Sequence, residues 1–458
     1  GPPRAASRVL LIGVDGLEWS VLRPLLAEGK CPNLAALMRR GSFGKLATLS
    51  LTLSPVVWTT VATGRLPKDH GIRNFLDADG QVYTSSQRRV RALWNIADRH
   101  GMSTNMFGWF ITWPAEPVAG LVVSGSSSSA LSDANWKPAL VPSIEGQVWP
   151  TEREAEVMAL AAEVGAPERI KALARDRIYG AALDASLNPE QQQVLQQTLW
   201  SIAADATYFE LARRFIAQSP ADLNLVYFGG TDVVSHRYWR QFRPEGFRWS
   251  EDHQSDAALA GVIPAYYEWV DAMIGELVAA AGEQATVFVV SDHGFHAVAQ
   301  DEPDPLHMTG HHMDAPPGVL VAAGPGIVVQ GDYDRFLQSG ALAVLGSVQD
   351  VAPTLLALLG LPGARDMEGR AYRAILAEGP AREAARLPPV ESHDLGFVPA
   401  PAKAVPTEMD ESFRERFGQL GYFELQTDSD DEVHVVPPPP APPATPPEGS
   451  PASGGGSR

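Results

Sequence analysis

The feature that most constrains the fold of this chain is a set of short apolar runs, each about as long as one buried strand. They are RVLLIGV at 8–14, LNLVYF at 223–228, ATVFVVS at 285–291 and GVLVAA at 318–323. Runs of this kind are typical of strands that are buried on both faces of a parallel sheet. Helical patterns or glycine-rich turns flank each of them. The alternation predicts an α/β fold, with a mostly parallel sheet as the middle layer and helices on both faces.

A different pattern precedes the second run. Apolar residues recur at helical spacing and predict one long helix: Val194, Leu195, Leu199, Ile202, Phe209 and Phe215. Asn188 before Pro189 predicts the start of this helix, as N-cap and first helical residue. We therefore expect residues 131–218 to form a helical insertion over the sheet.

The composition changes again near residue 426. DSDDE at 428–432 is followed by nine prolines between 437 and 451 and then by GGGSR. Such a segment has too few apolar residues to bury a core. We expect residues 426–458 to be an acidic, proline-rich, disordered tail.

Overall composition excludes several classes of protein. With 54 acidic and 36 basic residues the net charge is −18, whereas a protein that coats nucleic acid needs a basic face. No apolar run approaches the roughly 20 residues of a membrane helix. The single cysteine, Cys31, excludes an internal disulfide and a thiolate metal cluster. Oligomeric state and compartment stay open, because a removed signal peptide would leave no trace and proteins of either compartment can lack disulfides. An extracytoplasmic (periplasmic) location is slightly preferred over the cytoplasm.

Acids and histidines gather where the predicted strands end, which is the edge at which open α/β sheets bind ligands. Each run has its own set of such residues. Asp15 ends the first run, and Asp232 follows the second, with His236 one helical turn later. Asp292 and His293 end the third run, and His311 and His312 precede the fourth. One such feature alone is commonly a turn or a helix cap. Four of them on four strands indicate a metal site, and oxygen and imidazole ligands suit zinc, manganese or iron.

Ser54 in SPVVWTTVATG at 54–64 has two interpretations. As the residue before Pro55 it could simply cap a helix. It could also be a nucleophile, placed at a helix start whose amide groups favour a phosphate. Spacing alone does not separate the two.

The order of the motifs does separate them. The chain carries VLLIGVDGLEW, SPVVWTTVATGRLPKDHGI, GGTDVVSH, SDHGF and a GHH before GVLVAAGPGI. This series resembles the alkaline phosphatase superfamily, and within it the bacterial branch of the type I phosphodiesterase/nucleotide pyrophosphatase family. The resemblance covers residues 8–375. It implies a three-layer, alkaline-phosphatase-like catalytic domain, which we expect to span residues 8–425 with the insertion included.

The resemblance also implies a two-metal site, with zinc as the first choice and manganese or iron as alternatives. One metal would be held by Asp232, His236 and His312, with His311 as the fallback for His312. The other would be held by Asp15, Asp292 and His293, with Ser54 as a further ligand and as the nucleophile. Asn74 in HGIRN falls within one residue of an asparagine that contacts phosphate in the family.

This layout implies hydrolysis of a small phosphate ester, with nucleotides among the candidates, through a phosphoseryl intermediate. Monoesterases of the superfamily add cationic residues to the pocket, and the corresponding SSSSALSDANWKPAL offers only Lys137, which favours diesters or pyrophosphates. Arg65 and Arg73 lie close to Ser54 in sequence and keep a phosphomonoesterase open as the alternative. A phosphoglycerate-mutase-like phosphotransferase and a metal-binding pseudoenzyme or scaffold are further alternatives. The complete set of ligands and nucleophile favours an enzyme.

Several aromatic residues lie near these motifs. Trp109, Phe110 and Trp113 could stack on a leaving group, but we expect at least two of them to be core residues, because buried aromatics are far more common than base platforms. We also expect Tyr227, inside a predicted strand, to be a core residue.

Overall fold

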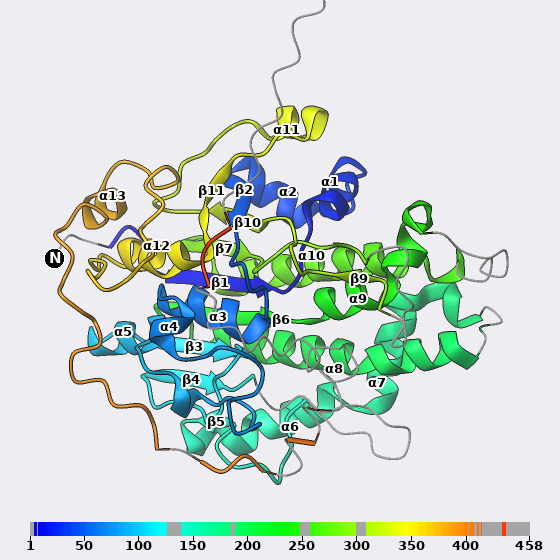
Figure 1. Cartoon of the computed structure of the whole chain (residues 1–458), viewed down its shortest axis with the longest axis horizontal. Helices are drawn as coiled ribbons and strands as arrows, with labels where there is room; N and C mark the ends of the chain where they lie inside the picture. The colour runs from blue at the N-terminus through cyan, green and yellow to red at the C-terminus, as the bar shows by residue number, and fades with distance from the viewer. Residues whose placement is uncertain are drawn as a thin grey trace, which may run out of the picture.

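The computed structural model describes residues 4–6, 8–125, 139–184, 187, 189–247, 257–298, 308–401, 403–406, 410–411, 414 and 433–436. Within these ranges the centre of the fold is a nine-stranded sheet, whose strands follow one another from top to bottom of Figure 1 in the order β11-β2-β10-β7-β1-β6-β3-β4-β5. Their bounds are β1 Arg8–Val14, β2 Gly41–Ala47, β3 Thr104–Phe107, β4 Gly120–Val123, β5 Val148–Trp149, β6 Leu223–Phe228, β7 Ala285–Val290, β10 Gly318–Ala323 and β11 Val344–Ser347.

The sheet is mostly parallel, as the apolar runs predict. β7, β1, β6, β3 and β4 pair in parallel, and β11 pairs in parallel with β2. β10 pairs antiparallel with both β7 and β2, and β5 pairs antiparallel with β4. The four predicted strands correspond to β1, β6, β7 and β10, but the last of these runs against its neighbours.

Alternating side chains of the central strands face two separate cores. On β1, Leu10, Ile12 and Val14 join one cluster, whereas Val9 and Leu11 join the other. Both faces of the strand are therefore buried, which explains why its sequence is apolar throughout instead of alternating.

Helices cover both faces and complete the three layers. The first core takes residues from α1 Trp19–Ala27, α2 Pro32–Arg39, α6 Glu154–Val164, α7 Pro167–Leu173, α8 Pro189–Gln218, α9 Gly230–Phe242, α10 Val262–Ala281 and α11 Tyr333–Ser339. The second takes residues from α3 Ser54–Thr63, α5 Leu93–Arg99, α12 Val351–Leu358 and α13 Pro380–Ala384. The short α4 Pro67–His70 follows α3. None of the helices in the described ranges is both long and apolar enough to cross a membrane.

The predicted insertion is not helical throughout. Its described part includes β5 at the edge of the sheet, followed by α6, α7 and the long α8. α8 begins at Pro189, as predicted, while Asn188 lies outside the described residues. α8 packs against α9 and α10 and reaches the sheet at β6 and β3 (Figure 1).

The structure describes a short piece of the predicted tail, residues 433–436. Val435 forms an antiparallel bridge with Leu49, and the amide of Ser50 donates to the carbonyl of His434 at 2.8 Å. Val433 and Val435 pack against the second core, so two apolar side chains hold this short piece. The rest of residues 426–458 lies outside the described residues.

Candidate active site

The topology brings the chemically informative residues to one edge of the sheet. β1, β6 and β7 run in parallel, so their carboxyl ends place Asp15, the start of α9, and Asp292 with His293 side by side. β10 runs antiparallel to β7, and the residues before it therefore arrive at the same edge. A two-stranded pairing of β8 His296–Ala297 with β9 Gly310–His311 leads the chain to His312.

Asp15, Asp292 and His293 form the first group that could hold a metal ion. The Nε2 atom of His293 lies 3.4 Å from Oδ1 of Asp15 and 3.2 Å from Oδ2 of Asp292, and all three side chains are buried. None of these three atoms has a hydrogen-bond partner among the described residues. Three buried, converging ligand atoms without hydrogen bonds fit a divalent cation, because buried polar groups are otherwise almost always satisfied. This group matches the set implied by the resemblance.

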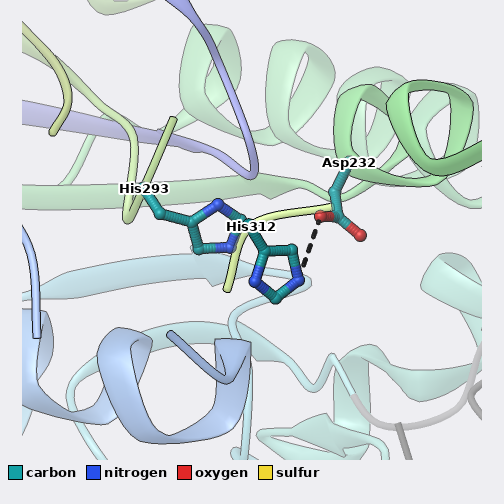
Figure 2. A group of neighbouring side chains, drawn as sticks. All are labelled: Asp232, His293 and His312. Carbon is teal, nitrogen blue, oxygen red and sulfur yellow. Dashed lines mark ion pairs between the residues drawn. The ribbon is translucent and has the colours of Figure 1, made fainter. Parts of the chain in front are cut away.

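Asp232, His293 and His312 form the second group, and their side chains converge in Figure 2. Nε2 of His312 lies 3.7 Å from Oδ1 of Asp232. His236 was expected in the place of His293. Its Nε2 is 3.4 Å from the same Asp232 oxygen, so His236 also faces this group. The His293 and His312 rings stack with centroids 3.9 Å apart, which brings His293 within reach of carboxylates of both groups.

The three histidines present the same ring nitrogen to the carboxylates because the other nitrogen is held by the protein. Nδ1 of His236 donates to the carbonyl of Gly310 at 2.8 Å, and Nδ1 of His293 donates to that of Gly294 at 3.1 Å. Nδ1 of His312 lies 3.2 Å from Oγ1 of Thr52, whose hydroxyl donates to the His312 carbonyl. Such partners leave Nε2 as the ligand atom. His311 differs, since its Nδ1 accepts from the Met313 amide and the ring is only half-buried.

Burial and mutual repulsion shift the pKa values of these groups away from their usual ranges. Burial, with the charge of Asp232 in addition, raises the pKa of Asp15 to about 7. Burial and the charges of Asp15 and Asp232 raise the pKa of Asp292 well above its usual value. Burial lowers the pKa of His293 to about 4, which favours the neutral ring that binds metal. Carboxylates crowded in this way are stabilised when a cation lies between them.

Trp58 and Tyr227 fix the orientation of Asp15. The indole Nε1 of Trp58 donates to Oδ2 of Asp15 at 3.0 Å, and the Tyr227 hydroxyl donates to the same oxygen at 2.6 Å, which leaves Oδ1 to face His293. A Cβ atom at Gly13 would lie 2.7 Å from the Trp58 ring, so glycine there allows the indole to reach Asp15.

Tyr227 packs against the second core, as predicted, but the bond from its hydroxyl to Asp15 is not predicted from the sequence. The role of Trp58 is not predicted either, although Trp58 lies four residues after Ser54 and therefore on the same face of α3.

Ser54 is the first residue of α3 and so lies one residue further into the helix than the N-cap position that the capping interpretation gives it. The N-cap residue is Leu53, and no side chain caps the helix. Burial raises the pKa of the Asp15 carboxyl group, and the nearby Ser54 side chain is among the groups that lower it. The helix start offers fewer amides to a phosphate than predicted, because the amides of Val56 and Val57 both donate to the Leu53 carbonyl.

A comparison with models of protein families identifies the family of this chain. The sequence matches the model of the type I phosphodiesterase/nucleotide pyrophosphatase family over residues 9–344. The chain belongs to this family. Membership places it among the ester hydrolases of the alkaline phosphatase superfamily, whose members depend on metal ions. Among curated proteins, none shows significant sequence similarity to the chain.

Solved structures with a related fold are distant from this phosphodiesterase-family chain. Murine ectonucleotide pyrophosphatase/phosphodiesterase 5, in complex with AMP, is 12% identical over 81% of this chain and 100% of that chain, with a TM-score of 0.44. A 2-O GAG sulfatase is 13% identical over 80% of this chain and 73% of that chain, with a TM-score of 0.46. Phosphonoacetate hydrolase from Sinorhizobium meliloti is 15% identical over 66% of this chain and 60% of that chain, with a TM-score of 0.39. At these TM-scores the likenesses bear on neither substrate nor mechanism.

In this family member a cavity with about 690 Å³ of empty space, part of it open to solvent, adjoins Ser54, Asp15 and Asp232. Its wall is rich in aromatic residues: Tyr83, Phe110, Trp200, Tyr208 and Tyr227. Of the clustered aromatics named from the sequence, Trp109 and Trp113 are core residues, as expected, and Phe110 lines the cavity.

Expected phosphate contacts are not all found at this cavity. No lysine or arginine is among its described lining residues, and Lys137 lies outside the described residues. Arg65 is instead held by carboxylates, with NH1 3.0 Å from both Asp366 and Asp394. Asn74 does not line the cavity either, and its Oδ1 accepts from the amide of Phe75 at 2.7 Å. The structure thus brings together every predicted metal ligand and Ser54, but not Asn74.

Proposed function

We propose that this protein is a two-metal phosphohydrolase that cleaves phosphodiester or pyrophosphate bonds through a phosphoseryl intermediate on Ser54. The observation that carries this proposal is the position of the Ser54 hydroxyl. Ser54 lines the cavity together with Asp15 of one metal group and Asp232 of the other. A phosphorus atom in this cavity would be within reach of the hydroxyl and of both groups.

The residues present fit two divalent cations. Asp15, Asp292 and His293 would hold one, and Asp232, His236 and His312 the other, with zinc favoured by the mixed carboxylate and imidazole donors. Such ions, when bound, lower the pKa of a coordinated oxygen and stabilise the attacking and leaving oxygens of an in-line displacement.

The chain's own residues hold the reacting groups in place and line the cavity around them. Asp15 lines the cavity beside Ser54 and is itself held by Trp58 and Tyr227, so the carboxylate next to the nucleophile is fixed by two further side chains. In the proposed first half-reaction the Ser54 oxygen bonds to phosphorus, the bond to the leaving alcohol or phosphate breaks, and the serine proton leaves with that group. In the second, water attacks phosphorus, releases the remaining phosphate monoester and regenerates the serine. The aromatic residues of the wall line the cavity beside the reacting centre.

Charge supports a diester or pyrophosphate over a monoester. A monoester dianion carries one more negative charge than a diester, and the described lining of the cavity supplies no arginine or lysine to offset it. Arg65, one of the two arginines that could have done so, is engaged by Asp366 and Asp394.

The test is to compare hydrolysis of bis-p-nitrophenyl phosphate with that of p-nitrophenyl phosphate by zinc-loaded protein. We expect a higher kcat/KM for the diester. An Asp292→Ala variant, which removes one metal ligand, measures the background from contaminating phosphatases. A higher kcat/KM for the monoester would overturn the diesterase assignment and leave the metal centre standing.

A further inference from the structure

Asp205 is a buried acid on α8 that the proposed chemistry does not use. It is 2% exposed and lines the cavity beside Ser54 and Asp232. Its carboxylate accepts hydrogen bonds from the amide of Gly229 and the amide of Gly230, both at 3.0 Å, and from the Tyr266 hydroxyl at 2.8 Å. Both oxygens are therefore committed to donors on two other elements.

The two amides belong to the beginning of α9. A helix leaves its first amides without partners, and a side chain at the N-cap usually satisfies one of them. The N-cap of α9 is Gly229, which has no side chain to offer. Asp205 takes over this role from a neighbouring helix, and its negative charge lies at the positive end of the α9 dipole.

Close packing makes this contact specific. A Cβ atom at residue 230 would lie 1.7 Å from the Tyr266 hydroxyl oxygen and 2.7 Å from Oδ2 of Asp205. Glycine is therefore required for the backbone of α9 to approach the carboxylate this closely. The first turn of α9 is fixed in place by Asp205 and Tyr266 together.

That first turn carries a metal ligand. Asp232 is the third residue of α9, and His236 follows one turn later with its Nε2 3.4 Å from Oδ1 of Asp232. A shift or rotation at the helix start would move both ligand atoms together. Among the described residues, the hydrogen bonds of Asp205 go to the start of α9 and to Tyr266, and none goes to Asp292 or His293, which follow β7.

We propose that Asp205 is a positioning residue for the metal site of Asp232 and His236, an inference that rests on the proposed two-metal centre. Through Asp205, the insertion helix α8 sets the geometry of this metal site. The geometry of the other site is set by the strands that Asp15, Asp292 and His293 follow. Asp205 acts through the backbone of α9 and not by contact with the metal.

The chain contains a matched control. Asp271 on α10 is 1% exposed and accepts from the amides of Asn33 at 3.1 Å and Leu34 at 2.7 Å, and from the side-chain amide of Asn33. It thus caps α2 from another helix, just as Asp205 caps α9. α2 carries none of the proposed site residues. Asp271→Asn reproduces the structural cost of Asp205→Asn without a ligand on the capped helix.

The experiment measures zinc affinity by competition with a chromophoric chelator, and melting temperature, for the unmodified protein, Asp205→Asn and Asp271→Asn. The asparagine amide group turns an acceptor into a donor that faces other donors. We expect Asp205→Asn to weaken one of two zinc sites by about 10- to 100-fold, the usual effect of a lost outer partner. We expect Asp271→Asn to lower the melting temperature and leave both affinities unchanged.

Cobalt(II) identifies the affected site, since its absorption spectrum in Asp205→Asn should match that of His236→Ala. If Asp205→Asn fails to fold, Tyr266→Phe tests the proposal in its place. This variant removes one of the three hydrogen bonds to Asp205 and should weaken zinc binding at the site of Asp232 and His236 about fivefold.

Three results would overturn the proposal: unchanged zinc affinity in Asp205→Asn, an equal loss in Asp271→Asn, or unchanged affinity in Tyr266→Phe. Failure of the unmodified protein to bind two zinc ions would instead refute the proposed function.

Discussion

Tyr227 offers a sharp test of how the metal ligand Asp15 is held. Its hydroxyl donates to Oδ2 of Asp15 at 2.6 Å, while its ring packs edge-on against Trp58 and Phe110, with centroids 5.2 and 5.6 Å apart. Tyr227→Phe removes the hydroxyl and keeps the ring. A hydrogen bond to a charged group contributes about 1.5–3 kcal/mol, which corresponds to about a 10- to 150-fold loss of metal affinity. We expect this loss at the site of Asp15, Asp292 and His293.

The assay is zinc competition combined with thermal melting. Tyr208→Phe is the matched control, because Tyr208 lines the same cavity and is buried but donates its hydroxyl to the carbonyl of Ser124 at 2.9 Å. It should cost stability and leave zinc affinity unchanged. Zinc affinity of Tyr227→Phe within about twofold of the unmodified protein, or an equal loss in Tyr208→Phe, would refute the reasoning.

Three further predictions concern stability. Removal of metal by a chelator should lower the melting temperature, because a ligand at about 100 times its Kd stabilises the folded state by about 2.7 kcal/mol; an unchanged value would argue against a bound metal. Gly13→Ala should destabilise the protein by about 1–3 kcal/mol in denaturant unfolding, since the new Cβ lies 2.7 Å from the Trp58 ring, and should weaken zinc binding. Burial, with the charge of Arg88 in addition, lowers the pKa of His70 to about 3, so the stability that neutral His70 contributes is present above pH 6.5 and is lost as pH falls toward 3. The stability difference between the unmodified protein and His70→Gln should shrink over that window, and a difference independent of pH would contradict this.

The sequence was sufficient to predict the architecture of the sheet because buried parallel strands are continuously apolar. β1, β6, β7 and β10 were each recognised on this basis. The direction of β10 could not be predicted, since a six-residue apolar run has the same pattern in either orientation. This reversal matters for the site, because it brings His312 to the edge where Asp15 and Asp292 end their strands.

The metal ligands could be predicted because they follow strands directly or lie one helical turn apart. The residues that orient these ligands could not be predicted from the sequence. Tyr227 resembles any other aromatic residue of a buried strand, and Asp205 lies 27 positions before Asp232 in a helix with no motif of its own. Only the packing of α8 against α9 brings this acid to the ligand helix. The contacts of residues 433–436 with Leu49 and Ser50 could not be predicted, because the acidic and proline-rich residues around them dominate the composition of the tail.

The central claim, that Ser54 attacks phosphorus beside two metal ions, is tested most directly by Ser54→Ala. Turnover of bis-p-nitrophenyl phosphate and metal content are measured on the same preparation. We predict that turnover falls by about 10⁴-fold or more, as is usual when a nucleophile is removed, while two metal ions per chain remain, since Asp15, Asp232 and the other ligands are untouched. Turnover at the unmodified rate, with metal content unchanged, would contradict the account.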